Sequence, residues 1–566
     1  MFRPYRWPLA LVIAIIVASS VVSMASPFLL RATIDEALPK QDVNLLLWLT
    51  GGMVAVAVIT SAFGVVQTWI STKVGQQIMH RLRTDVFAHL QRQSISFFTR
   101  TRTGEVQSRI TNDIGGMQSV VTSTATSIAS NLTTAVATAV AMVALSWQLS
   151  LISLVVMPPA IYLTRRVARM RREVTTKQQQ ELADLNVVVE EGLSISGIQL
   201  VKTMGAGPAL TERFTASSSR LIDLELRAEL AGRWRMASMS VIFAAIPAII
   251  YLSAGLPATS GAMTIGTLIA FTTLQNGLFR PLMGLLNVSV SLISSLALFA
   301  RIFEYLDLPI EVDEPSKPAA IEPRRTAGHV RLEDVTFTYD GSVRAAIDGV
   351  TLDIPAGSTL ALVGETGSGK STLGALLARL YDPGAGRITI DGIDLRDLRL
   401  ADLAAVVGVV SQETYLLHTT VRENLRYAKP DASDEEIYAA ARAAQIHELI
   451  VGLPDGYDTM VGSRGHRFSG GEKQRIAIAR TLLRDPRVLV LDEATSALDN
   501  ETERAVQRAF DELSKGRTTI TIAHRLSTVR TADQIVVIDD GRVIESGTHH
   551  SLVADNGRYA SLALAS

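Results

Sequence analysis

The chain has 566 residues, of which 48% are hydrophobic and 19% are charged, and its formal net charge at pH 7 is −1. This length exceeds what one hydrophobic core supports, and the mean hydropathy of +0.25 is higher than that of most soluble proteins. The near-neutral charge argues against nucleic-acid binding, and the absence of cysteine excludes disulfides, thiolate metal sites and cysteine nucleophiles.

Long stretches without Asp, Glu, Lys or Arg occur only in the N-terminal part of the chain. A helix needs roughly 20 apolar residues to cross about 30 Å of hydrocarbon. We therefore predict a transmembrane domain over residues 1–305. Its six spans are expected at about 7–30, 45–72, 118–146, 149–166, 237–256 and 262–300, with one tight turn near Trp147-Gln148.

The first apolar stretch has a second interpretation. Met1–Ala25 resembles a secretory signal, because Arg3 and Arg6 precede an apolar run that ends in small residues. The run is longer than the apolar region of a typical signal, so we expect it to be retained as the first span.

Basic residues set the predicted orientation. Residues 73–113 and 165–235 are rich in Lys and Arg, whereas the loops near residues 148 and 258 contain neither. Cytoplasmic loops of membrane proteins carry the excess of Lys and Arg. Both termini and everything after Arg301 are therefore expected in the cytoplasm, and the chain is predicted to be a multi-pass protein of the cytoplasmic (inner) membrane.

The same basic segments are too long for ordinary turns. Lys73–Gln93 and Arg165–Glu191 show helical apolar spacing, mixed-charge faces and little Gly or Pro. We interpret them as helical extensions that leave the bilayer and turn back well below it. Disordered loops are the alternative, which the periodicity disfavours.

A second domain follows a short linker. Residues 306–328 contain four prolines and several charges without an apolar period, which is typical of a linker. From residue 329 to 566, short β-rich runs such as "STLALVG" and "RVLVLDE" alternate with helical patterns. This alternation predicts a layered α/β domain.

The segment "LVGETGSGKST" of this domain fits the phosphate-loop pattern G-x-x-x-x-G-K-[ST] between an apolar strand and a helix. Backbone N–H groups of such a loop, together with the helix N-terminus, bind phosphate oxygens. Lys370 is expected to reach the β- and γ-phosphates of ATP, and the Ser371 hydroxyl to ligate Mg²⁺. The predicted ATP-binding residues of the loop are Gly364, Glu365, Thr366, Gly367, Ser368, Gly369, Lys370, Ser371 and Thr372.

An acidic pair ends a later apolar strand, in "RVLVLDEATSALD". Asp492 is suited to hold Mg²⁺, and Glu493 to act as general base for an attacking water. Helix capping or turn chemistry would explain such a pair in isolation. The phosphate loop upstream favours the catalytic interpretation.

Directly ahead of that strand, "FSGGEKQRIAIAR" places Ser469, Gly470 and Gly471 at the start of a helix. Bare N–H groups at a helix N-terminus form another anion site. A second phosphate-binding helix suggests a nucleotide site that two subunits close together. At this point the sequence resembles the ATP-binding cassette (ABC) transporters, and the resemblance covers essentially the whole chain.

The resemblance implies further roles. In this family Ser469, Gly470 and Gly471 would complete the nucleotide site of the partner subunit. Tyr339 resembles the aromatic residue that stacks on adenine, and Gln412 resembles the glutamine that senses Mg²⁺ and the attacking water. Asp499 matches an aspartate that contacts the site across the dimer, and His524 matches the γ-phosphate switch histidine. The implied cofactors are ATP and Mg²⁺.

The N-terminal half resembles the exporter branch of the family. Phe97–Ile114 is similar to the segment that forms the first cytoplasmic coupling helix, and Glu190–Gly207 to the stretch around the second. The resemblance therefore implies a six-helix transmembrane domain with cytoplasmic helical extensions, followed by an α/β P-loop ATPase domain of ABC type. One membrane half and one ATPase domain per chain imply a dimer. The complete set of motifs favours a homodimer over a heterodimer.

The expected function is ATP-driven efflux of amphipathic or hydrophobic, lipid-like compounds by alternating access. Three alternatives stay open: a flippase dedicated to one lipid, an importer with the exporter fold, and a non-transporting cytosolic cassette ATPase. The six predicted spans and the neutral charge count against the cytosolic ATPase. Fusion of the membrane half to the ATPase counts against an ordinary nutrient importer.

The substrate is not evident from the sequence. The third predicted span is rich in small hydroxylated residues, which close helix packing explains as well as a substrate surface does. Arg280 lies between two charge-free runs and beside Pro281. It is expected either to line the substrate cavity or to extend to the inner interface and pair with a neighbouring helix.

Overall fold

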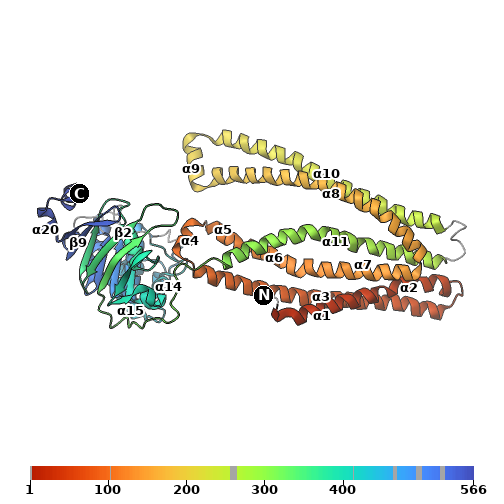
Figure 1. Ribbon diagram of the computed structural model, residues 1–566, viewed down its shortest axis with the longest axis horizontal. Coiled ribbons are helices and arrows are strands. Elements are labelled where there is room, and N and C mark those ends of the chain that lie inside the picture. The colour runs from red at the N-terminus through yellow and green to blue at the C-terminus, as the bar shows by residue number, and fades with distance from the viewer. Residues whose placement is uncertain are drawn as a thin grey trace. The chain divides into compact units, whose positions relative to one another are not determined.

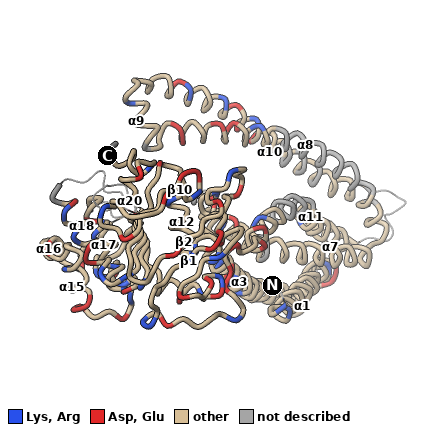
Figure 2. Tube along the Cα trace, turned by 60° about the vertical axis from the view of Figure 1, so that its left-hand side comes forward, with Lys and Arg blue, Asp and Glu red and all other residues tan. Residues whose placement is uncertain are grey.

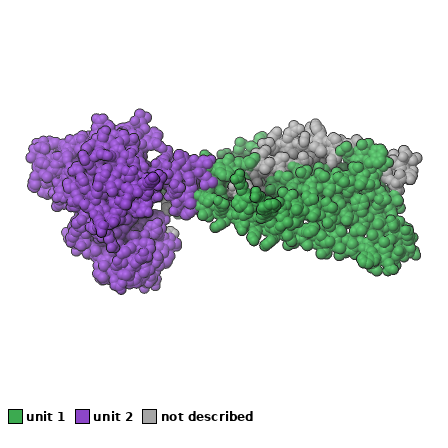
Figure 3. Space-filling model, turned by 60° about the horizontal axis from the view of Figure 1, so that its bottom comes forward, with its two compact units in different colours: residues 1–86, 108–304 green, residues 87–107, 305–566 purple. Residues whose placement is uncertain are grey.

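The computed structural model describes residues 3–101, 103–254, 264–411, 414–462, 468–492, 500–522 and 529–565. The chain divides into two compact units, shown in different colours in Figure 3. Unit 1 comprises residues 1–86 and 108–304, and unit 2 comprises residues 87–107 and 305–566. A short internal segment, 87–107, thus packs with the C-terminal unit although it lies far from it in sequence.

Unit 1 is built entirely of helical elements over its described residues (Figure 1). They are η1 (Arg3–Tyr5), α1 (Arg6–Ser23), α2 (Ala25–Ala32), η2 (Thr33–Ala37), α3 (Val43–Gln91), η3 (Arg109–Asp113), α6 (Ile114–Ser119), η4 (Val120–Thr124), α7 (Ala125–Leu145), α8 (Trp147–Leu193), α9 (Ile195–Met204), α10 (Gly207–Ala254) and α11 (Ile265–Leu306). Helices α3 and α11 each end a few residues inside unit 2.

Several of these helices have the composition of membrane spans. Among the described residues, three helical stretches are long and apolar enough to cross a membrane: Arg3–Ala37, Val43–Gln91 and Gly104–Leu145. Figure 2 shows that α1 and α7 carry little charge, whereas charged residues gather near α9, at the ends of α8 and α10. The predicted spans in α8, α10 and α11 stay predictions.

The segments predicted as extensions are helical, since Lys73–Gln91 belongs to α3 and residues 165–191 belong to α8. The turn before α8 lies at Ser146, whose side chain accepts a hydrogen bond from the Leu149 N–H at 3.4 Å. Helix α9 then joins α8 to α10, and Gly205 ends α9 in a left-handed conformation with φ of 65°. Helices α8 and α10 run side by side, and Arg220 of α10 pairs with Glu181 of α8.

Close approaches fix α11 within unit 1. The Asp35 carboxylate accepts hydrogen bonds from the Thr264 hydroxyl at 2.5 Å and the Gly266 N–H at 2.9 Å, and thereby caps the start of α11. Further along, a Cβ atom on Gly284 would lie 2.2 Å from Nδ2 of Asn131 on α7. A glycine at this crossing lets the two helices approach closely, as is usual between membrane helices.

Unit 2 contains two sheets. The smaller has the strand order β2-β1-β4-β5 and is antiparallel, with β1 (Val330–Phe337), β2 (Ile347–Ile354), β4 (Ala385–Ile390) and β5 (Ile393–Asp394). The larger has the order β10-β9-β3-β8-β7-β6. Its strands are β3 (Thr359–Val363), β6 (Val407–Val410), β7 (Val488–Asp492), β8 (Thr518–Ile522), β9 (Gln534–Asp539) and β10 (Arg542–Gly547), parallel except for β10.

Hydrophobic burial holds these layers together. One core lies between the two sheets and α12 (Lys370–Leu377), and the strands there are apolar on the faces that pack inward. A second core joins the larger sheet to a group of helices. The remaining helices of unit 2 are α4 (Ile95–Arg100), α5 (Thr103–Ser108), α13 (Leu400–Val406), α14 (Val421–Arg426), α15 (Asp434–Ala443), α16 (His447–Val451), α17 (Gly470–Arg484), α18 (Asn500–Ser514), α20 (His549–Ala554) and α21 (Arg558–Ala565).

The predicted linker is irregular in structure but is attached to the rest of unit 2. The Arg379 guanidinium donates to the Asp313 carbonyl at 2.9 Å, the Ala319 N–H donates to the Asp397 carbonyl at 2.8 Å, and the Leu400 N–H donates to Glu314 at 3.0 Å. Because these bonds fall along the segment, it lies against the rest of the unit instead of forming a free tether.

Candidate nucleotide-binding site

The predicted phosphate loop connects β3 to α12. Gly369 precedes α12 with φ of 111°, and a Cβ atom there would lie 2.5 Å from the Ala346 carbonyl oxygen. A Cβ atom on Gly364 would lie 2.2 Å from the Ile538 carbonyl oxygen. Both positions require glycine because a side chain would collide with neighbouring backbone. The loop is also tied to the β9–β10 turn, where the Gly541 N–H donates to the Ser368 carbonyl at 3.0 Å.

Lys370 lies inside this loop with only 6% of its surface exposed. Its ammonium group donates to the carbonyls of Gly364 at 2.8 Å and Glu365 at 2.7 Å, and to the Ser368 hydroxyl at 3.4 Å. Burial lowers the pKa of Lys370 from its usual value, while the negative charge of Asp492 acts in the opposite direction. The loop therefore holds a positive charge in place by its own acceptors.

A pocket of about 470 Å³ opens beside the loop. Tyr339 lines it together with most of the predicted phosphate-loop residues: Thr366, Gly367, Gly369, Lys370, Ser371 and Thr372. The Tyr339 hydroxyl lies 3.0 Å from the Thr372 hydroxyl, and its ring meets Phe337 and Tyr381 edge-on. Tyr339 is 37% exposed, so part of this residue is accessible to a ligand in the pocket.

The pocket also contains residues that the sequence analysis missed. Arg344 and Asp540 line it and form an ion pair, and Ser342 lies beside them. Outside the pocket lining, Glu365 of the loop pairs with Arg558 of α21. No motif marks Ser342, Arg344, Asp540 or Arg558, because they lie in the β1–β2 connection, the β9–β10 turn and the C-terminal helix. Only the folded sheets bring them to the loop.

Of the remaining predicted catalytic and metal-binding residues, the structure describes only Asp492. Asp492 ends β7, two strands from β3, and is close enough to Lys370 for its charge to raise the pKa of that lysine. Gln412, Glu493, Asp499 and His524 lie outside the described residues.

Ser469 begins α17 as a helix cap. Its hydroxyl accepts from the Glu472 N–H at 3.4 Å, and the Glu472 carboxylate accepts from the Ser469 N–H at 2.7 Å. The two hydrogen bonds together form a reciprocal capping box at the start of α17. Among the described residues that line the phosphate-loop pocket, none is Ser469, Gly470 or Gly471. Their role in a nucleotide site of a partner subunit stays a prediction.

The first predicted coupling segment contacts the loop that follows Tyr339. Arg100, at the end of α4, pairs with Asp340 at 2.9 Å and with Glu311 of the linker at 3.2 Å. The Ser94 hydroxyl donates to Glu311 at 2.5 Å, and the ring of Phe97 packs edge-on against Tyr305. The sequence analysis named this segment but not the partners of Arg100.

Arg280, the predicted substrate residue, lies in unit 1. Helix α11 continues on both sides of it with Pro281 inside the helix, and the Arg280 side chain is exposed. Whether it faces a substrate stays a prediction.

Comparisons with known proteins agree with this geometry. A family model described as "ABC transporter transmembrane region" matches residues 9–282, and one described as "ABC transporter" matches residues 347–496. The "ATP-dependent lipid A-core flippase" of Syntrophus aciditrophicus is 35% identical over 99% of this chain and 92% of its own. A Bacillus subtilis protein, 34% identical over 99% of this chain and 97% of its own, has a name that assigns it provisionally to multidrug export.

A solved structure extends the match to three dimensions. A bacterial Atm1-family ABC exporter with ATP bound superposes with a TM-score of 0.79 at 31% identity, over 98% of this chain and 97% of its own. The predicted fold class, a helical transmembrane domain followed by an ABC-type ATPase domain, is confirmed. The chain is thus an ATP-binding membrane protein that belongs to the ABC transporter family and couples ATP hydrolysis to transport.

Proposed function

We propose that this protein is an exporter of the cytoplasmic membrane that moves amphipathic, lipid-like compounds outward by alternating access. The observation that carries the proposal is the match to an exporter over 98% of the chain, membrane and ATPase parts together. The proposed domains are residues 1–305 with six spans, the linker 306–328, and a cytoplasmic ATPase domain over 329–566. The names of the flippase and multidrug relatives support a lipid-like or hydrophobic cargo.

In the ATPase domain we assign ATP to the 470 Å³ pocket. Adenine stacks on the exposed face of Tyr339, and the loop N–H groups and Lys370 hold the phosphates. Lys370 exchanges its present acceptors, Gly364 and Glu365, for phosphate oxygens. The resulting charge-assisted hydrogen bonds are stronger than those to neutral carbonyls.

The residues present also fit Mg²⁺, which prefers oxygen ligands and keeps several waters beside substrate phosphates. The exposed Ser371 hydroxyl lines the pocket, and the Asp492 carboxylate is near Lys370. We assign Ser371 and Asp492 as ligands, with Gln412 as a further ligand and sensor. Bound Mg²⁺ would neutralise charge on the phosphates. Glu493 serves as the general base that accepts a proton from the attacking water, and His524 contacts the γ-phosphate of ATP.

The working unit is a homodimer in this proposal. Ser469, Gly470 and Gly471 do not line the pocket of their own chain among the described residues, so a second copy would use them to complete its site. Asp499 would contact the same nucleotide site across the dimer. A purified single chain without ATPase activity until a second gene product is added would contradict self-pairing.

Transport by the purified protein in liposomes tests the function. Fluorescent lipids and amphipathic dyes are offered to vesicles with the ATPase side outward, and movement of probe to the opposite leaflet or lumen is followed with and without ATP. We expect ATP-dependent movement from the ATPase side to the inner leaflet or lumen of these vesicles, and Glu493→Gln should abolish it. ATP-dependent movement in the opposite direction would identify an importer, and activity toward one lipid alone would identify a dedicated flippase.

A further inference from the structure

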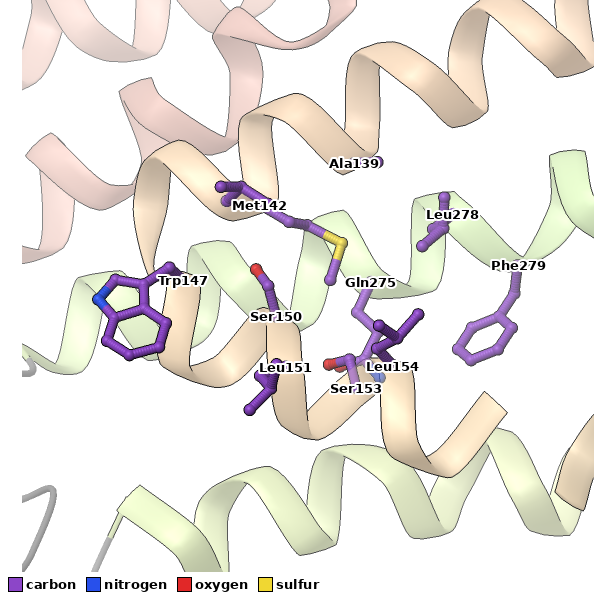
Figure 4. A pocket seen from close by; sticks show the side chains of 11 residues that line it. Ala139, Met142, Trp147, Ser150, Leu151, Ser153, Leu154, Gln275, Leu278 and Phe279 are labelled. Carbon is purple, nitrogen blue, oxygen red and sulfur yellow. The ribbon is translucent and has the colours of Figure 1, made fainter. Parts of the chain in front are cut away.

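A second pocket lies within unit 1, away from the ATPase domain. It has a volume of about 280 Å³ and is lined by residues of α7, α8 and α11. Figure 4 shows Met142, Ser153 and Gln275 in its middle and Trp147 and Phe279 at opposite ends. All of its lining residues fall within the matched transmembrane region, residues 9–282.

The base of this pocket is buried but not entirely apolar. Gln275 is 2% exposed, and its amide oxygen has no hydrogen-bond donor among the described residues. The Ser153 hydroxyl is also buried and donates to the Leu149 carbonyl at 3.0 Å, so its proton is committed elsewhere. Leaving a buried acceptor without a donor costs free energy in a medium that lacks water. Gln275 therefore offers an acceptor to a ligand.

The mouth of the pocket has the opposite character. Trp147, Leu151 and Leu154 of α8 are each more than half exposed. Leu151 and Leu154 fall in the predicted fourth span, and Trp147 lies in the predicted turn just before it. In a membrane span, exposed apolar side chains contact lipid tails. A ligand that reaches the pocket through this mouth comes from the hydrocarbon phase.

We propose that this pocket binds a small amphiphile that dissolves in the bilayer and has one apolar chain and one O–H donor. The chain occupies the volume between Met142 and Phe279, and the hydroxyl donates to the Gln275 amide oxygen. The volume lies just below the usual range of roughly 300–1,000 Å³ for sites of drug-sized ligands, which favours a single-chain amphiphile over a two-chain lipid. The site is separate from the one proposed around Arg280, which does not line this pocket. The proposal does not depend on the direction of transport.

Trp147 provides a reporter at the mouth. Full-length protein in phosphatidylcholine nanodiscs is titrated with 10-bromodecan-1-ol, whose bromine quenches tryptophan fluorescence, and with 1-bromodecane, which lacks the hydroxyl. We expect a saturable component of quenching with the alcohol that disappears in Trp147→Phe. The alcohol should half-saturate at about three- to tenfold lower concentration than the alkane, since it alone satisfies Gln275.

Gln275→Leu should remove this difference by weakening alcohol binding about three- to tenfold, with alkane binding unchanged. The matched control is Asn276→Leu, because Asn276 is the next amide on α11, is exposed and does not line the pocket. Equal half-saturation by the two probes in the wild-type protein would overturn the proposal without any variant. Strictly linear quenching that persists in Trp147→Phe would overturn it as well.

Discussion

The phosphate-loop pocket and the membrane pocket are organised around different kinds of contact. At the centre of the first, Lys370 is held by acceptors that lie within six residues of it, although residues from 339–346 and 540–541 complete the lining. The second is lined by residues of α7, α8 and α11, and no sequence motif marks Gln275, whose amide oxygen has no donor among the described residues. A site made of local contacts can be recognised in a sequence, whereas one made of distant contacts requires the fold.

Charge separates the two pockets as well. Lys370, Arg344 and Asp540 line the first, whereas the lining of the second contains no Asp, Glu, Lys or Arg. Substitutions in the first pocket should therefore change nucleotide affinity or turnover, and those in the second should change only the binding of apolar ligands.

The largest expected effect separates chemistry from binding inside the ATPase domain. Glu493→Gln should lower steady-state ATP hydrolysis by about 10²- to 10⁴-fold, because a general base contributes that much. Nucleotide affinity should stay close to wild type, since the phosphate loop is intact, and bromodecanol binding should not change. ATPase assays and equilibrium nucleotide binding measure the two quantities. Near-normal turnover would remove Glu493 as the base.

Lys370→Ala should weaken ATP binding about 10- to 100-fold, because charged hydrogen bonds to phosphate are lost. Lys429→Ala is the control: Lys429 is an exposed lysine of the same domain that pairs with Glu436. Equilibrium binding of a fluorescent ATP analogue distinguishes the two variants. Equal affinities in both would contradict the role of Lys370 in binding phosphate.

The backbone of the loop can be tested without touching a charge. Gly369→Ala adds a collision with the Ala346 carbonyl to the cost of a positive φ, whereas Gly357→Ala has a positive φ of 76° and open space around the new Cβ. We expect Gly369→Ala to destabilise the domain by about 2–4 kcal/mol and Gly357→Ala by about 1–2 kcal/mol. Differential scanning calorimetry, which can follow the unfolding transition of this domain, gives the comparison. Equal melting temperatures would show that the loop adjusts at no cost.

Arg280 tests whether the membrane domain holds a charged substrate site in addition to the apolar pocket. If Arg280 faces the substrate, Arg280→Ala should require about two- to fivefold more compound to stimulate ATPase activity, and Arg280→Lys should recover part of the loss. Basal ATPase activity and expression are the controls. Unchanged concentration dependence in both variants would place Arg280 outside the substrate site.

The smallest effect concerns the C-terminal helices. His549 Nδ1 lies 2.7 Å from the Tyr559 hydroxyl, which can donate to the neutral ring. Burial, then the positive charges of Arg530 and His550, lower the pKa of His549 below its usual value. As the pH falls, His549 therefore becomes protonated in the unfolded chain before it does so in the folded chain. Its contribution to the free energy of unfolding is complete above about pH 6.5 and decreases as the pH falls below that value. The melting temperature of wild type should fall slightly more between pH 7.5 and 5.5 than that of His549→Asn. Parallel pH profiles would contradict this.

The fold class and the centre of the nucleotide site follow from local sequence. The apolar strand, the glycines and Lys370 must occur in that order for a loop to surround a phosphate, so their spacing predicts the β3–loop–α12 unit. Charge-free length alone likewise predicts long apolar helices. Both inferences depend on residues that are close together in the chain.

The tertiary structure decided everything that joins distant segments. It placed β3 between β9 and β8, and it brought Arg344 to Asp540 and Arg100 to Asp340. It also left the Gln275 amide oxygen, at the base of an apolar pocket, without a donor in the part of the chain that the structure describes. An exposed ion pair contributes at most about 1 kcal/mol and can form wherever the fold brings opposite charges together. The sequence by itself therefore determined the local phosphate-binding unit and the apolar helices, whereas the contacts between segments depend on packing that no short stretch of residues specifies.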